Sequence, residues 1–189
     1  MVTDPRLPTS VALLRGINVG GRHAVPMAEL AACLRDAGHG AVRTFLQSGN
    51  VLLAARPASG AGLEGALEEA LAERFGFAVP TLVRSRAELA ATVAAAPPDH
   101  GSDALRSDVL FLKAPLTAGE VLDQLPELRE GVDAVAAGPG VVYFSRVAAE
   151  ARRTRITRLM AMPVFGRMTV RTWRTTTRLL ALLDEPLPA

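Results

Sequence analysis

Two polar, glycine-rich segments interrupt apolar stretches near the N-terminus. They are LLRGINVGG at 13–21 and LQSGNVLL at 46–53. Glycine-rich backbone can present N–H groups, and arginine and amide side chains add hydrogen-bond donors, which together suit a phosphate or carboxylate group. We therefore predict a ligand site for a small anionic metabolite or nucleotide. The candidate ligand-binding residues are Arg15, Asn18, Gly20, Gly21, Gln47, Ser48 and Asn50.

A structural role explains many of the same residues. Asparagine and glycine are the types that turns require for backbone reasons. The glycines match neither GxGxxG nor GxxxxGK[ST], so the two common phosphate-loop patterns do not apply. Arg15 could form an ion pair with an acidic residue of the second half instead. Arg15 and Gln47 favour a ligand site because neither residue type forms turns.

The sequence contains no complete catalytic constellation. Cys33 is the only cysteine and shares a predicted helical face with apolar residues, which favours a core position. Ser48 stands in QSGN rather than GxSxG, and the histidines are dispersed, with no neighbouring Cys or acidic residue at metal-ligand spacing. We assign no metal, cofactor or reaction. An enzyme at this edge remains an alternative, and it would need groups from the second half, with Glu150, Thr154 and Arg155 as possible contributors.

The first half of the chain follows the order strand, helix, strand, strand, helix, strand. This order is typical of a ferredoxin-like, split βαβ fold with an antiparallel sheet ordered 4-1-3-2. Pro80 predicts an edge position for the last strand, and Gly49-Asn50 suits a type II′ turn. The predicted elements are strand 10–16, helix 26–38, strands 41–47 and 50–55, helix 63–75 and strand 77–84.

This topology brings the two polar segments together. The first strand neighbours the third and runs antiparallel to it, so the end of the first lies beside the turn that begins the third. The helix starting at Pro26 begins at the same edge, where its unpaired N–H groups and positive dipole end add to the predicted anion site.

The second half repeats the order of elements. The predicted elements are a helix at 88–96, strand 108–113, helix 117–125, strands 132–136 and 141–146, helix 153–162, strand 168–170 and helix 173–183. We predict a ferredoxin-like N-terminal half at 1–96, a linker at 97–107, and a related α/β C-terminal half with a basic helical tail at 108–189.

Three strands are apolar at successive positions, and therefore on both faces, at 11–14, 51–55 and 109–112. A sheet with one face in water should alternate between apolar and polar residues. Both faces are therefore expected to be covered. The prediction is an α+β protein with two ferredoxin-like halves packed into one compact body.

Charge is unevenly distributed along the 189 residues. Residues 108–150 hold three basic and seven acidic side chains, whereas 151–189 hold eight basic and two acidic ones. This asymmetry favours internal pairing between the acidic middle and the basic tail. Nucleic-acid binding through the tail arginines is the alternative. It is the less favoured one, since aromatic residues for base stacking make up only 4% of the chain.

The N-terminal sequence MVTDPRLPTS lacks the apolar core of a signal peptide, and no apolar run reaches membrane length. With a single cysteine, a disulfide framework is excluded as well. We expect a cytoplasmic protein without a membrane partner, as a monomer or weak homodimer.

The segments LLRGINVGG, PMAEL and LQSGNVLL closely resemble a bacterial family catalogued as domain of unknown function 1697. RRTRITRLM and TVRTWRTTTRLL look like later motifs of that family, with Thr172 where asparagine is expected. The resemblance implies a two-part α/β fold and no assigned activity. Thr172 suits a helix N-cap, as asparagine would, so this difference keeps the cap.

Overall fold

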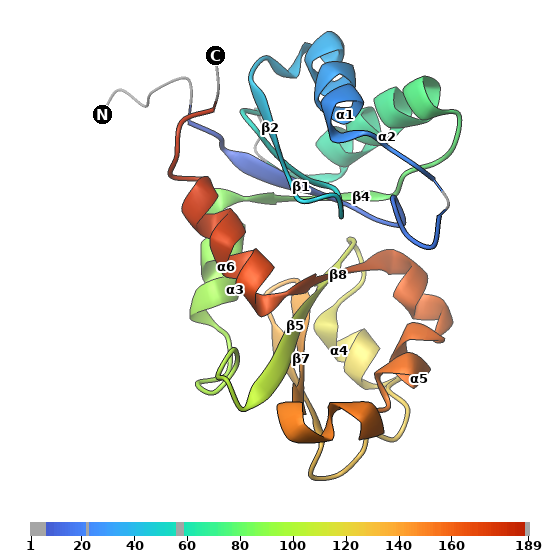
Figure 1. Ribbon diagram of the computed structural model, residues 1–189, viewed down its shortest axis with the longest axis vertical. Helices are drawn as coiled ribbons and strands as arrows, with labels where there is room; N and C mark the ends of the chain where they lie inside the picture. Colours follow the sequence, from blue (N-terminus) through green and yellow to red (C-terminus); the bar gives the residue numbers. More distant parts are fainter. Residues whose placement is uncertain (1–6, 22, 56–58, 188–189) are drawn as a thin grey trace. The chain divides into compact units, whose positions relative to one another are not determined.

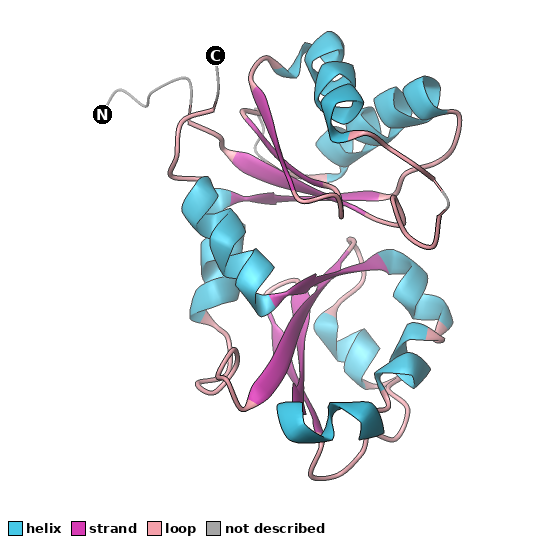
Figure 2. Cartoon of the chain, viewed as in Figure 1, coloured by secondary structure: helices cyan, strands magenta, loops and turns pink. Residues whose placement is uncertain are grey.

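The computed structural model describes residues 7–21, 23–55 and 59–187. The chain divides into two compact units, one comprising Met1–Leu89 with Leu179–Ala189 and the other Ala90–Arg178. Each unit has its own antiparallel sheet and its own helices (Figure 2). The predicted halves at 1–96 and 108–189 include residues 1–6 and 188–189, which lie outside the described residues.

The first unit is built on a four-stranded sheet (Figure 1). Its strands lie in the order β2-β3-β1-β4, and all neighbouring pairs are antiparallel. This is the predicted 4-1-3-2 arrangement, which is confirmed. The strands are β1 (Ser10–Leu14), β2 (Val42–Phe45), β3 (Asn50–Leu53) and β4 (Thr81–Ser85).

Two helices, α1 (Met27–Leu34) and α2 (Ala61–Phe75), cover one face of this sheet (Figure 1). Leu30 of α1 and Leu67 of α2 are fully buried in one cluster with Leu14 of β1. The predicted helix 26–38 is divided. Pro26 is the N-cap of α1, and the last turn widens into the π-helix η1 (Arg35–His39), in which Gly38 is left-handed with φ +89°.

Strand β4 lies at the edge of the sheet, as Pro80 predicted. It begins at Thr81, later than the predicted Phe77. Its outward N–H groups are bonded by carboxylates of α2, since Thr81 N donates to Glu68 at 2.8 Å and Val83 N donates to Glu64 at 2.9 Å. The helix thus satisfies the backbone donors that an edge strand would otherwise expose.

The second unit repeats the topology of the first. Its sheet has the order β6-β7-β5-β8 with antiparallel neighbours, which confirms the predicted internal repeat. Residues 105–107, predicted as part of a linker, are the first residues of the central strand. The strands are β5 (Leu105–Leu112), β6 (Asp133–Gly138), β7 (Val141–Val147) and β8 (Met168–Thr172).

Short helices complete the second unit. Leu110, Phe144 and Leu159 form its main core cluster, and Thr117 caps α4 by accepting a hydrogen bond from Glu120 N at 3.3 Å. The helix predicted at 153–162 is shorter in the structure, where α5 covers 156–160 and the 3-10 helices η2 and η3 lie on either side of it. The helices are α4 (Ala118–Leu122), η2 (Ala148–Arg153), α5 (Ile156–Met160) and η3 (Pro163–Arg167).

The chain passes from one unit to the other within helix α3 (Arg86–Ala94) and again within helix α6 (Trp173–Leu182). Thr172 accepts a hydrogen bond from Thr175 N at 3.2 Å, which confirms the predicted N-cap of α6. After α6 the chain returns to the first unit, where Glu185 pairs with Arg43 at 2.9 Å. The sequence-based division had placed this segment in the second half.

Side chains on both faces of strands β1, β3 and β5 are buried, as predicted. Val11, Ala12 and Leu13 are all 0% exposed although successive side chains of a strand point to opposite faces. Leu52 of β3 and Phe111 of β5 are likewise fully buried. Both faces of these central strands are therefore covered.

Candidate functional site

The loop after β1 has an unusual backbone. Left-handed φ angles recur along it, with Asn18 at +55°, Gly20 at +61° and Gly21 at +73°. Such angles are strained for most side chains, but glycine adopts them freely and asparagine tolerates them. This requirement accounts for the GINVGG pattern. Gly20 and Gly21 are exposed at the surface.

Asn18 holds this loop against the turn between β2 and β3. Its amide nitrogen donates to the carbonyl of Gln47 at 2.9 Å and to that of Val25 at 3.0 Å, and its amide oxygen accepts from Val25 N at 2.8 Å. Leu14 N also donates to Gly49 O at 2.8 Å. The predicted juxtaposition of the two polar segments is confirmed, and Asn18 itself serves as the clamp.

The turn between β2 and β3 differs from the predicted type II′ hairpin. Phe45 pairs with Asn50, so the loop has four residues and Asn50 is the first residue of β3. The buried Asn50 amide donates to Phe45 O at 2.8 Å and to Ser48 Oγ at 3.1 Å. These bonds fix the shape of the turn.

Several predicted ligand residues lie together on the surface of this edge. Gln47 and Ser48 are exposed beside the loop that presents Gly20 and Gly21. Arg15 is half-buried, and its backbone N–H donates to Pro80 O at 2.9 Å, which ties the loop to the start of β4. Asn18 and Asn50 contribute scaffolding bonds at the same edge.

The start of α1 is less positive than the sequence suggested. Pro26 is the N-cap without a side-chain bond, and Glu29 occupies the first turn. A carboxylate there already interacts with the positive end of the helix dipole. The helix therefore adds less to an anion site than its position alone would predict.

His23 packs against the end of α2. Its ring stacks on Phe77 with centroids 4.4 Å apart, and Nδ1 lies 3.4 Å from Gly16 O. The side chain is exposed, as expected for a loop histidine. Sequence reasoning missed the stacking, because nothing in the local pattern around Phe77 marks it as a partner of the distant loop.

Thr154 and Arg155 bond within the second unit. The Thr154 hydroxyl donates to Asp133, and Arg155 N donates to the same carboxylate at 2.9 Å. The Arg155 guanidinium pairs with Glu127 at 2.8 Å. These contacts fix the start of β6 and give both residues a structural role.

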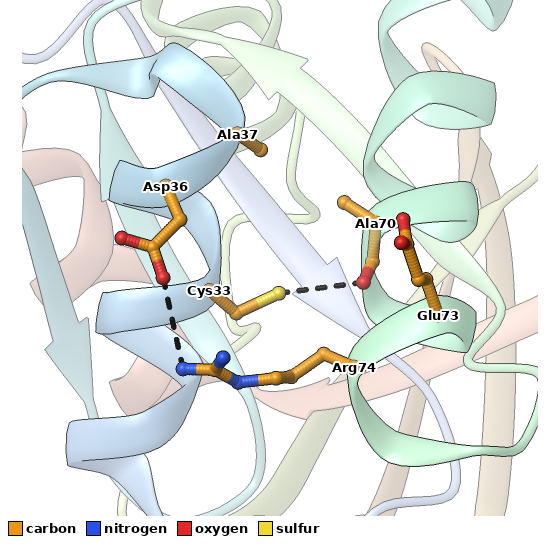
Figure 3. Close-up of a pocket in the computed structure, with 6 residues that line it drawn as sticks. All are labelled: Cys33, Asp36, Ala37, Ala70, Glu73 and Arg74. Carbon is orange, nitrogen blue, oxygen red and sulfur yellow. Dashed lines mark hydrogen bonds and ion pairs between the residues drawn. The ribbon is translucent and has the colours of Figure 1, made fainter.

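Cys33 lies between α1 and α2 beside a pocket of about 400 Å³ (Figure 3). Its thiol donates to Ala70 O at 3.4 Å, and Arg74 reaches Asp36 at 3.7 Å across the pocket. Burial raises the pKa of the Cys33 thiol, so the reactive thiolate is disfavoured. The predicted core position of Cys33 is confirmed.

Within residues 7–21, 23–55 and 59–187, no group of three or more His, Cys, Asp or Glu side chains is placed to hold a metal ion. Over the same residues, no helix is long and apolar enough to cross a membrane.

Asn18→Gly is expected to lower the free energy of unfolding by about 1–3 kcal/mol, because it leaves partly buried backbone groups without their partner. Glycine keeps the left-handed backbone accessible, so the loss reports on the amide. Urea unfolding measures this change in the free energy of unfolding. Gln47→Ala is the control, since Gln47 accepts the bond through its main-chain carbonyl, and its effect should stay within about 0.5 kcal/mol. Equal losses for the two variants would contradict the clamp.

The fold and this edge define a class of α+β protein with two split βαβ sheets and a clamped, glycine-rich loop at the end of the first strand. Residues 7–143 match the family described as "Protein of unknown function (DUF1697)", and the chain belongs to that family. It is also similar in structure to the conserved bacterial protein SP0830 from Streptococcus pneumoniae, with a TM-score of 0.81 and 25% sequence identity. The match covers 93% of this chain and 98% of that one. A comparison with curated proteins found no match.

Proposed function

We propose that the protein binds a small anionic ligand at the edge formed by residues 15–23 and 46–49. The ligand would carry a phosphate or carboxylate group, as metabolites and nucleotides do. The observation that carries this proposal is the Asn18 clamp, which holds the two polar segments together while Gly20, Gly21, Gln47 and Ser48 remain exposed.

Preorganisation is the physical basis of the proposal. Binding to a mobile loop is weakened by the entropy lost when the loop becomes ordered. Here the loop is tied to β4 through Arg15 N and to the turn through Asn18. The exposed backbone and amide donors can therefore bind a ligand without further ordering of the chain.

The nucleic-acid alternative has less support. Arg153 pairs with Glu150 at 2.9 Å and Arg155 with Glu127 at 2.8 Å, so these two tail arginines are engaged with the acidic middle segment. Arg171 is buried and bonds Thr169 at 3.0 Å. The aromatic residues Phe111 and Tyr143 of the second sheet are buried too, rather than displayed for stacking.

A thermal-shift screen of nucleotides, sugar phosphates and carboxylates tests the proposal. A ligand at a hundred times its Kd stabilises the native state by about 2.7 kcal/mol. For a chain of this length that corresponds to a rise in Tm of about 5–10 °C. At least one class of compound is expected to produce such a rise.

Substitutions at the edge test whether the ligand that raises the Tm binds there. Arg15→Ala and Gln47→Ala should each remove most of the ligand-induced shift. Arg74→Ala is the matched control, because Arg74 is an exposed arginine of α2 whose guanidinium pairs with Asp36 beside the Cys33 pocket. No shift with any compound class, or a shift that survives both edge variants, would refute the proposal.

A further inference from the structure

The second unit contains a pocket of about 380 Å³ where the N-terminal part of β5 meets β7 and the start of α6. Its walls include Arg106, Asp108, Arg146, Thr172, Trp173 and Arg174. We infer that this pocket is a separate binding site for a phosphate-bearing small molecule, with the phosphate held by its three arginines. None of these residues belongs to the edge of the first unit.

Strand pairing concentrates the positive charge. Arg106 of β5 and Arg146 of β7 are directly opposite each other in the antiparallel register. Like charges in such a pair are destabilising. Arg146 is compensated by Asp108, whose carboxylate lies 2.7 Å away, and both side chains are largely buried. This pair also fixes the Arg146 guanidinium in the pocket wall.

The other two arginines lack such compensation. Over the described ranges 7–21, 23–55 and 59–187, neither Arg106 nor Arg174 has a carboxylate within 4.0 Å. Both side chains are exposed. Three guanidinium groups and one carboxylate therefore line the pocket, with a net charge of +2. Guanidinium groups bind phosphate oxygens in pairs, which suits this arrangement.

The start of α6 adds to the positive electrostatic potential of the pocket. Thr172 caps the helix, and its first turn contains Arg174 but no acidic residue. The first N–H groups of a helix lack intrahelical partners and favour a negative charge, whereas a cation there is unfavourable. A bound phosphate would offset both the exposed N–H groups and the clustered arginines.

Trp173 forms a rigid wall of the pocket. A Cβ on Gly101 would come within 3.0 Å of the indole, so the Gly101 backbone packs directly on the ring. The His100 ring meets the indole edge-on at 5.0 Å and is only 7% exposed. Burial lowers the pKa of His100, which disfavours the charged form of the ring.

His100 also carries a buried atom whose bonding is incomplete. Its Nε2 has no hydrogen-bond partner among the described residues. Buried polar atoms are bonded in nearly all native structures, so an unpartnered one marks a place where a water or ligand atom is expected. The His100 ring contacts Trp173, which is one wall of the pocket.

Titration of the full-length protein with inorganic phosphate tests the inference. Trp173 is the chain's single tryptophan, so its fluorescence reports on the pocket wall. We expect a saturable fluorescence change at constant ionic strength, with matching heat in calorimetry. Arg106→Ala and Arg174→Ala should each weaken phosphate binding by about tenfold or more, because each removes a charge-assisted contact.

Two control variants distinguish phosphate binding in this pocket from binding elsewhere on the protein. Arg158→Ala removes an exposed arginine of the same unit outside the pocket and should leave the titration unchanged. Arg15→Ala changes the proposed edge of the first unit and should leave the Trp173 fluorescence response unchanged as well. A loss of the Trp173 response in Arg15→Ala would assign the signal to the edge and overturn a separate site.

Stability gives an independent readout. Because Arg106 faces Arg146, Arg106→Ala should leave the Tm unchanged or raise it slightly. A marked fall in Tm would make Arg106 structural and overturn its role in binding. The inference also fails if phosphate gives no saturable response, or if Arg106→Ala and Arg174→Ala both retain it. Binding of an oligonucleotide alone, weakened equally by Arg158→Ala, would indicate a diffuse basic surface instead.

Discussion

Gly49→Ala is expected to lower the free energy of unfolding by about 2–5 kcal/mol, the sum of backbone strain and overpacking. Gly49 has φ +77°, and a Cβ there would lie 2.8 Å from Leu14 Cβ and 2.8 Å from Ile17 Cδ1. Leu14 belongs to the central strand and cannot move without disturbing the sheet. Urea unfolding followed by circular dichroism measures the loss.

Gly20→Ala is the matched control for this experiment. Gly20 also has a left-handed backbone, with φ +61°, but a Cβ there would meet nothing within 4 Å. It should therefore lose only the backbone strain, about 1–2 kcal/mol. A loss for Gly20→Ala as large as that for Gly49→Ala would show that packing against Leu14 and Ile17 contributes nothing.

Leu183→Ala is expected to lower the free energy of unfolding by about 2–5 kcal/mol, because it empties a fully packed site. Leu183 is 1% exposed and follows α6 in the segment assigned to the first unit. Circular dichroism reports on the whole chain, whereas Trp173 fluorescence reports on the second unit. Coincident unfolding midpoints would show that both units unfold in one step.

Leu180→Ala, within α6 itself, provides the comparison. Leu180 is half-buried, so the same truncation removes less buried surface and should reduce stability by less than half as much. Equal losses at the two positions would contradict the burial of Leu183. An unchanged midpoint for Leu183→Ala would mean that the segment after residue 178 does not support the first unit.

Much of the architecture could be predicted because it follows from local pattern and element order. Alternating helices and apolar strands specified the 4-1-3-2 sheets, and Thr172 before Trp173 specified a capped helix. The same topology correctly placed Asn18 near Gln47. Each of these inferences needs only neighbours in sequence or a known rule of strand pairing.

Other features depend on contacts that no local pattern reveals. The Asn18 amide faces Val25 because of the particular course of the loop. Arg106 and Arg146 lie far apart in sequence, and only the register of β5 and β7 makes them neighbours. The predicted II′ turn was wrong because the pairing of Phe45 with Asn50 takes Asn50 into the strand.

The return of the chain to the first unit has a consequence for biosynthesis. Residues 90–178 are one continuous stretch, so all of the second unit can emerge from the ribosome in sequence. The first unit also requires the segment from Leu179 onward, which is translated after the whole second unit. Domains generally fold in the order of their synthesis. Here the unit begun first is completed last, when Arg43 of β2 and Arg86 of α3 gain Glu185 and Asp184 as partners.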